Sequence, residues 1–305
     1  MSPLVSLARV AALAAVAVLT AGAARAQLPG PLVDAAWLEA HRGEVRVVEV
    51  HPDAPGDATI PGAAVVGMDQ LRASRDVGAE RFDRLSLPPA AFEALMAEAD
   101  VDADDRVVVA WTGAGASGAS DAAYLYWQLR HYGHDAVALL DGGVAAVASL
   151  AETMAAPARA DGPAFAAEPR SGFNITTPEL AALVARDRPA LIDNRPLAFH
   201  VGLAQKSYVA RPGHIPGSAI FPFTFMVQAG EAPLFHDRER LARLAEDLGV
   251  PSREPLIVYC NSGRVSALGW FVLNELVGRD AVLYDGSLHA WARDQARPMT
   301  TAMAR

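Results

Sequence analysis

Short apolar runs alternate with longer stretches of helical periodicity along most of this chain. The runs are rich in β-branched residues and are bounded by glycine, proline or polar residues, which is typical of buried strands. They lie at 47–51, 106–111, 137–140, 191–195, 256–259 and 281–284. The clearest helical stretches are 122–129 and 267–276. Because strands that alternate with helices form parallel sheets, the pattern predicts an α/β fold of open, mainly parallel sheets flanked by helices.

The first half of the chain resembles the second half, segment by segment and in the same order. The matching pairs are 47–51 with 191–195, 59–63 with 214–218, 106–111 with 255–260, and 141–143 with 285–287. An ordered repeat of this length indicates two copies of one domain. We therefore expect a first domain at 27–150 and a second at 173–305. The segment 151–172 is rich in alanine, proline and charged residues, lacks periodicity, and is predicted to be a linker.

The longest apolar segment lies at the N-terminus, where residues 10–24 are all apolar or small and follow the basic Arg9. This run is shorter than the roughly 20 residues that a membrane-spanning helix needs, although a membrane anchor is the alternative. The sequence Ala24-Arg25-Ala26 fits the small-x-small rule for signal cleavage. We predict a cleaved signal peptide at 1–26 and a periplasmic mature protein without membrane contact.

Composition excludes several classes of protein. Of the 305 residues, 52% are apolar and 20% are charged, which argues against a disordered or disulfide-dense chain. The formal net charge of −9 argues against a nucleic-acid partner. No histidine or acidic cluster has the spacing of metal ligands, so neither a metal nor another cofactor is expected.

The single cysteine, Cys260, carries the candidate chemistry. It follows the predicted strand 256–259 and precedes a short loop and a helix that is expected to begin near Ser266. Backbone N–H groups in such a loop, together with the positive end of the helix dipole, favour a thiolate and predict a lowered pKa for Cys260. A buried cysteine that only packs is the alternative. A position before a Gly-Arg turn, Gly263-Arg264, favours the reactive thiol.

Several motifs of the second half surround this cysteine in the sequence. They are 191–195 (Leu-Ile-Asp-Asn-Arg), 213–218 (Gly-His-Ile-Pro-Gly-Ser), 260–265 (Cys-Asn-Ser-Gly-Arg-Val) and 284–287 (Tyr-Asp-Gly-Ser) with Trp291. The first half carries related motifs at 60–63, 133–134 and 140–143. With these motifs, nearly the whole mature chain resembles the tandem-domain rhodaneses of the thiosulfate/3-mercaptopyruvate sulfurtransferase family. Such tandems keep the cysteine in the C-terminal copy, which matches Cys260 against Trp111.

The resemblance implies a sulfurtransferase that works through a persulfide on Cys260. The thiolate would take a sulfane sulfur from a small anionic donor and pass it to a nucleophilic acceptor such as cyanide, a thiol or a protein. The residues that the resemblance places at the substrate are Arg195, Asn261, Ser262, Gly263, Arg264 and Val265. Asp193 and His214 would support the site structurally, and a salt bridge to Asp193 is an equal alternative for Arg195. Arg211 is a weaker candidate for anion binding, and Trp111 would fill an inactive first copy.

Departures from the family patterns bear on the donor. Thiosulfate-type relatives carry basic residues directly after the cysteine, where this chain has Asn261 and Ser262. Mercaptopyruvate-type relatives join the serine of the loop to a histidine of the first domain, and Thr59 stands at that histidine's position. The loop as a whole is most similar to that of small periplasmic rhodaneses of the phage-shock type. We therefore expect thiosulfate rather than 3-mercaptopyruvate as the donor.

Three other functions fit parts of the pattern. A cysteine phosphatase needs an arginine six residues after the cysteine, where this chain has Ser266. A sulfur carrier that binds a partner without turning over a free donor could use the Gly/Ser-rich segment 113–118 as a contact surface. A redox thiol protein would need an external thiol, because the chain has no second cysteine.

Overall fold

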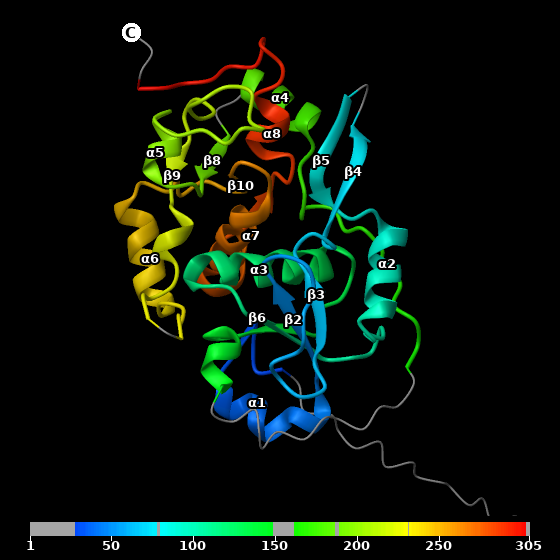
Figure 1. The fold of residues 1–305 in the computed structure, drawn as a ribbon. Helices are drawn as coiled ribbons and strands as arrows, with labels where there is room; N and C mark the ends of the chain where they lie inside the picture. Colours follow the sequence, from blue (N-terminus) through cyan, green and yellow to red (C-terminus); the bar gives the residue numbers. More distant parts are fainter. Residues whose placement is uncertain (1–27, 78–79, 149–161, 187–188, 231, 303–305) are drawn as a thin grey trace, which may run out of the picture.

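The computed structural model describes residues 28–77, 80–148, 162–186, 189–230 and 232–302, whose arrangement is drawn in Figure 1. The predicted signal peptide lies outside the described residues, as does the first part of the predicted linker. Within the described part of the chain, no helix is both long enough and apolar enough to cross a membrane.

The first parallel sheet is built from the first half of the chain. Its strands run in the order β1-β7-β6-β2-β3, and all neighbours are parallel. They are β1 (Leu32–Val33), β2 (Arg46–His51), β3 (Ala64–Gly67), β6 (Val107–Trp111) and β7 (Val137–Leu140). The helices of this half are α1 (Ala35–His41), α2 (Pro89–Glu98) and α3 (Gly115–His131), with 3-10 turns at Arg42–Glu44 and Gly143–Val147. The central strand β6 is buried along its length, as its uninterrupted apolar sequence predicts.

The second parallel sheet has the strand order β11-β10-β8-β9. Its strands are β8 (Ala190–Asp193), β9 (Ala219–Ile220), β10 (Leu256–Tyr259) and β11 (Ala281–Leu283). The helices of this half are α4 (Thr177–Arg186), α5 (Leu197–His200), α6 (Arg238–Asp247), α7 (Arg264–Trp270) and α8 (Ser287–Trp291), with a 3-10 turn at Phe223–Phe225. When strands related by the sequence repeat are matched, this order equals β7-β6-β2-β3 of the first sheet. The predicted α/β fold of mainly parallel sheets flanked by helices is confirmed.

Two helices differ from their predicted extents. The helix predicted at 122–129 is α3, which begins at Gly115, so the segment 113–118, a possible contact surface in one alternative function, is helical from Gly115 onward. All residues from Gly118 to Leu129 are buried, which removes the polar face that would mark a helix in the sequence. The helix predicted at 267–276 begins earlier, as α7, and continues as a π-helical stretch, Phe271–Val277.

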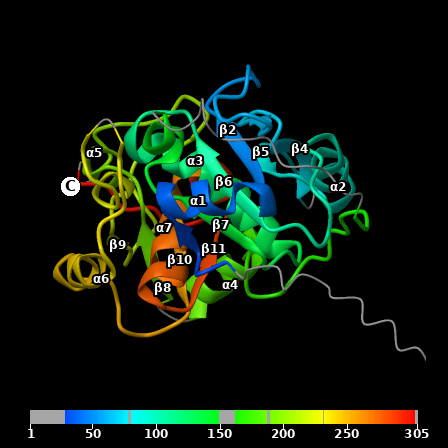
Figure 2. The ribbon, with the colours of Figure 1, turned by 90° about the horizontal axis from the view of Figure 1, so that it is seen from below.

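Helices α3 and α7 lie at the centre of the molecule and join the two halves. Both helices are central in the two perpendicular views, with α2 and α6 on opposite sides of them (Figures 1 and 2). The ring of Tyr126 on α3 packs edge-on against Phe271, with 4.9 Å between the ring centres, and tilts against Trp270. All three side chains are fully buried or nearly so, and they belong to one hydrophobic core shared by both halves. Burial of such rings stabilises the interface by about 1.5–3 kcal/mol for each side chain.

An antiparallel hairpin leaves the first half and reaches the second. It consists of β4 (Arg72–Val77) and β5 (Glu80–Ser86), and Figure 1 shows it beside α8. Phe82 of this hairpin packs in a core cluster made mostly of second-half residues, among them Leu288. The backbone N–H of Ser86 donates to Asp285 Oδ2 at 2.8 Å. The hairpin thus brings side chains of the first half to the edge of the second sheet.

Candidate active site

Cys260 stands at the carboxyl end of β10, the strand between β8 and β11. The carboxyl ends of strands in open parallel sheets are where ligands bind. Gly263 adopts a φ of 80°, and a Cβ at this position would clash with Asp285. Helix α7 starts at the next residue, Arg264. The strand, tight loop and helix expected from the sequence therefore occur around Cys260.

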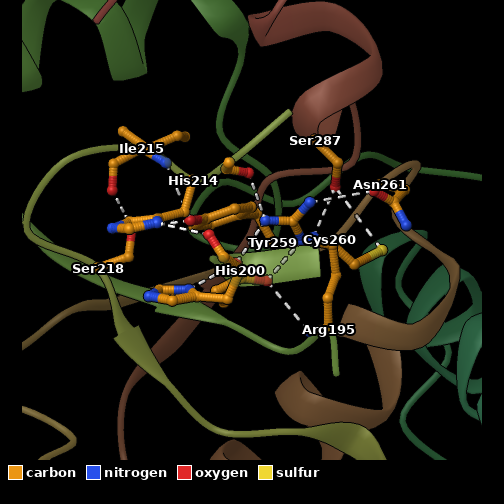
Figure 3. A network of polar contacts seen from close by, with 11 residues as sticks. Arg195, His200, His214, Ile215, Ser218, Tyr259, Cys260, Asn261 and Ser287 are labelled. Carbon is orange, nitrogen blue, oxygen red and sulfur yellow. Dashed lines mark hydrogen bonds and ion pairs between the residues drawn. The ribbon is translucent and has the colours of Figure 1, made fainter. Parts of the chain in front are cut away.

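Two serine hydroxyls lie against the sulfur of Cys260. Ser266 Oγ is 3.3 Å from Sγ. Ser287 Oγ, drawn in Figure 3, is 3.9 Å from it. The Ser287 hydroxyl also accepts the backbone N–H groups of Cys260 and Gly263, at 3.1 and 3.0 Å. Ser287 has a φ of 47°, a region that residues other than glycine seldom adopt, and this strained position sets its hydroxyl beneath the loop. Neither serine was assigned to the site from the sequence.

The remaining N–H groups of the loop are free to hold a negative charge. Within the described part of the chain, the backbone N–H groups of Asn261, Ser262, Arg264 and Val265 donate no hydrogen bond. Successive unpaired N–H groups at the start of a helix form a site for an anion. This arrangement can stabilise a thiolate, a persulfide or the oxygens of a small anionic substrate.

Asp193 and Arg195 form a buried ion pair beside the loop. Asp193 Oδ1 accepts Arg195 Nε at 2.8 Å, and Asp193 Oδ2 accepts Arg195 Nη2 at 2.6 Å. His200 Nδ1 lies 2.9 Å from the same carboxylate (Figure 3). Burial opposes ionisation of Asp193, but the hydrogen bonds from Arg195 and His200 outweigh burial and lower its pKa. The remaining Nη1 of Arg195 donates to Asn261 Oδ1 at 3.3 Å, so the pair also supports the loop.

His214 lies behind this pair and makes structural contacts. Its ring stacks on His200 with 3.7 Å between the ring centres, and its Nδ1 lies 2.8 Å from the backbone oxygen of His200. Burial lowers the pKa of His214, which favours its neutral form. The guanidinium of Arg211 donates to the backbone oxygens of Ala292, Asp294 and Arg297, which leaves it tied to the backbone.

A cavity of about 410 Å³ opens over Cys260. Its basic lining residues are Arg72, Arg84, Arg195, Lys206 and Arg264, and its other lining residues are Ser117, Pro196, Phe199, Tyr208, Phe223, Asn261, Ser262 and Val265. Among the described residues, no carboxylate lines this cavity. The cavity therefore offers a positive, partly apolar environment next to a thiol. Gly263, which the sequence also assigned to the substrate site, shapes the turn and is not among the lining residues.

Arg264 lines the cavity, but its charge is neutralised from the first half. Its Nη2 donates to Asp121 Oδ2 of α3 at 2.6 Å, its Nε donates to Asp121 Oδ1, and its Nη2 lies 3.1 Å from Ser117 Oγ. Asp121 is fully buried, and burial raises its pKa although Arg264 opposes the rise. The resemblance placed Arg264 at the substrate, and it does line the cavity, where it is held in an ion pair between the two halves.

Two cationic side chains of the cavity come from the hairpin β4–β5, and sequence reasoning missed both. Arg72 lies at the start of β4, and Arg84 lies in β5 with a φ of 64°. The guanidinium of Arg84 sits over the ring of Tyr208, 4.4 Å from its centre. Lys206, the third missed cation, is exposed in the loop before Tyr208. The only signal in the sequence was a polar, arginine-rich segment at 72–84 with no motif to connect it to Cys260.

The equivalent position of the first half holds a packed tryptophan. Trp111 ends β6 and is 1% exposed, and its ring packs edge-on against Phe235. A Cβ on either Gly118 or Gly143 would clash with Trp111, so these glycines make room for the ring. Trp111 therefore occupies the position that Cys260 holds in the second half. Among the described residues, there is also no cluster of side chains suited to hold a metal ion.

Known proteins resemble this chain in a family match, in sequence and in fold. Residues 176–294 match the rhodanese-like domain family. A Mycobacterium tuberculosis protein assigned as a thiosulfate sulfurtransferase is 30% identical over 272 residues, covering 84% of this chain and 92% of that protein. A Haloferax volcanii protein with the same assignment is 28% identical over 289 residues, covering 88% and 95% of the two chains. The crystal structure of a 3-mercaptopyruvate sulfotransferase from Escherichia coli shares the fold, with a TM-score of 0.66, 24% identity, and coverage of 85% of this chain and 98% of that one.

Proposed function

Because the chain belongs to the rhodanese family of sulfurtransferases, we propose that it transfers the outer sulfur of thiosulfate to a small nucleophile through a persulfide on Cys260. Sulfur transfer itself follows from the family. The choice of thiosulfate is supported by the cationic cavity over Cys260 and by the names of the similar proteins from M. tuberculosis and H. volcanii. The observation that carries the proposal is the free cysteine at a strand end inside that cavity.

The first half-reaction loads the cysteine. The Cys260 thiolate attacks the outer sulfur of thiosulfate, a new sulfur–sulfur bond forms, and the old one breaks with its electron pair leaving on sulfite. Thiosulfate is a dianion and the thiolate is an anion, so the two reactants repel each other. The basic side chains of the cavity and the unpaired N–H groups of the loop offset this repulsion.

The second half-reaction removes the outer sulfur from the Cys260 persulfide. A nucleophile such as cyanide attacks the outer sulfur of the persulfide, takes that sulfur as thiocyanate, and returns the electron pair of the broken bond to Cys260 as a thiolate. Until then, the terminal sulfur carries negative charge at the position that the loop N–H groups surround. Ser266 and Ser287 contact Sγ itself and can hold the side chain in one orientation through both steps.

Steady-state kinetics with two donors tests the choice of thiosulfate. We expect kcat/KM for thiosulfate, with cyanide as the acceptor, to be at least about tenfold higher than for 3-mercaptopyruvate. The reason is that, among the described residues, Ser262 has Arg72 and Tyr208 as its side-chain partners, at 3.4 Å each, and no histidine that could complete a proton-transfer triad. A preference for 3-mercaptopyruvate would refute the thiosulfate proposal. A single stoichiometric transfer without turnover would favour the sulfur-carrier alternative.

We further propose that the protein is exported to the periplasm. The support is the sequence pattern of residues 9–26, a basic residue followed by an apolar run and a small-x-small site. The intact mass of the protein recovered from a periplasmic fraction is expected to correspond to a chain that begins at Gln27. Recovery of the full chain, only from the cytoplasm or only from membranes, would contradict the proposal.

A further inference from the structure

We infer that Arg72, a residue of the half that lacks a catalytic cysteine, selects anionic donors at Cys260. This inference deepens the proposed function and rests on it only in taking the donor to be an anion. It concerns a residue on β4, which is far from Cys260 in the sequence but lines the same cavity.

Two arginines that line the cavity, Arg195 and Arg264, are neutralised by ion pairs, whereas Arg72 is not. Arg195 is bound to Asp193 and Arg264 to Asp121, each through two hydrogen bonds. Each of these pairs has no net charge, so neither arginine presents a full positive charge to a substrate.

Arg72 makes its hydrogen bonds to neutral oxygens. Its Nη2 donates to the backbone oxygen of Ser262 at 2.7 Å, and its Nη1 lies 3.4 Å from Ser262 Oγ. Its guanidinium lies over the ring of Tyr124, 5.2 Å from the ring centre. The positive charge of Arg72 acts to lower the pKa of Asp121, but the Asp121 carboxylate is hydrogen-bonded to Arg264. Asp285, which accepts the Tyr124 hydroxyl, is paired with Arg75. Among the described residues, no carboxylate forms a hydrogen bond or ion pair with Arg72, so its positive charge remains at the cavity.

The position of this charge matters because Ser262 is the second residue after the cysteine. A cation hydrogen-bonded to the backbone of the loop lies beside the N–H groups that hold the substrate. Thiosulfate-type relatives carry basic residues directly after the cysteine, and this chain has none there. Arg72 supplies the missing charge from the other half, through the hairpin that packs on α8. Lys206 adds charge at a more exposed position of the same cavity, whereas Arg84 is paired with Asp83.

The test uses two alkylating reagents of nearly equal size that differ in charge. Iodoacetate and iodoacetamide each form a carbon–sulfur bond with the Cys260 thiolate and release iodide, so neither requires sulfur transfer. The quantity measured is the ratio of the iodoacetate rate to the iodoacetamide rate at low ionic strength. In Arg72→Gln, which keeps a donor for the Ser262 oxygen but not the charge, we expect this ratio to fall about tenfold. Arg72→Lys should recover part of it, and kcat/KM for thiosulfate should follow the same order.

Arg81→Gln is the matched control. Arg81 lies on the same hairpin, pairs with Asp76 at the surface and does not line the cavity, so its loss removes the same charge without touching the site. The inference is overturned if the ratio in Arg72→Gln equals that in Arg81→Gln. It is equally overturned if both reagents slow down together, because Arg72 would then act only on the shape of the loop. A ratio that falls while the protein shows no turnover of thiosulfate would uphold the inference and refute the proposed donor.

Discussion

Replacing Cys260 with serine is expected to abolish sulfur transfer, with kcat falling below the detection limit. A hydroxyl can occupy the same position, but it cannot attack thiosulfate to form a persulfide, and no second thiol exists in the chain to replace it. The measurement is thiocyanate formation from thiosulfate and cyanide by Cys260→Ser beside the unchanged protein. Because the Ser266 and Ser287 hydroxyls lie against this buried position and can pair with the new hydroxyl, thermal stability should change little.

Ser266→Ala provides the control for this experiment. It removes a hydroxyl 3.3 Å from the sulfur but leaves the thiol in place, so sulfur transfer should continue at a reduced rate. Undiminished transfer by Cys260→Ser would remove Cys260 from the mechanism. Equal and complete losses in both variants, with the thiol of Ser266→Ala still open to iodoacetamide, would show that reactivity does not depend on the thiol alone.

Asp193→Asn is expected to cause the largest loss of stability among single changes near the site. The substitution keeps the shape of the side chain but leaves the buried Arg195 guanidinium, 2% exposed, without its counter-charge. Breaking a buried ion pair from one side typically costs about 3–5 kcal/mol of the free energy of unfolding. Urea unfolding at pH 7 measures this cost. Asp76→Asn is the control, because it breaks an exposed pair with Arg81 and should cost less than about 1 kcal/mol.

The pH dependence of the free energy of unfolding, measured for Asp193→Asn and for the unchanged protein, gives an independent check. The pKa of Asp193 is lowered in the folded chain, so the unfolded chain binds its proton at a higher pH than the folded chain does. The stability that Asp193 contributes is therefore full above its ordinary pKa of about 3.9 and is lost as the pH falls through the lower folded value. Asp193→Asn should lack this part of the acid destabilisation. Equal stability of variant and parent at pH 7 would show that the pair contributes nothing net.

The parts of the fold that were predictable have strong local signals. The uninterrupted apolar runs became β6, β7, β8 and β10, because parallel strands covered on both faces need apolar residues at every position. The loop at Cys260 was predictable because a cysteine, a glycine and an arginine follow a strand within a few residues. The equal strand orders of the two sheets reflect the internal repeat.

The parts that were not predictable depend on contacts between the halves. The start of α3 has small residues and no side-chain cap, and its burial comes from α7 and the first sheet, which no local pattern reveals. The pairing of Arg264 with Asp121 joins residues of different halves, and so does the contact of Arg72 with Ser262. A single sequence gives the types of these residues but not their partners. The sequence therefore pointed to Cys260 and to the arginine of its own loop, Arg264, but contained no signal that Arg72 of the other half lines the same cavity.

The intact mass of the protein tests most directly whether a persulfide forms on Cys260. After incubation with thiosulfate and removal of excess reagent, the mass of the chain should rise by about one sulfur atom, and cyanide should return it to its starting value. The same treatment of Cys260→Ser should leave its mass unchanged. No gain in the unchanged protein, or an equal gain in Cys260→Ser, would contradict a mechanism that passes through Cys260.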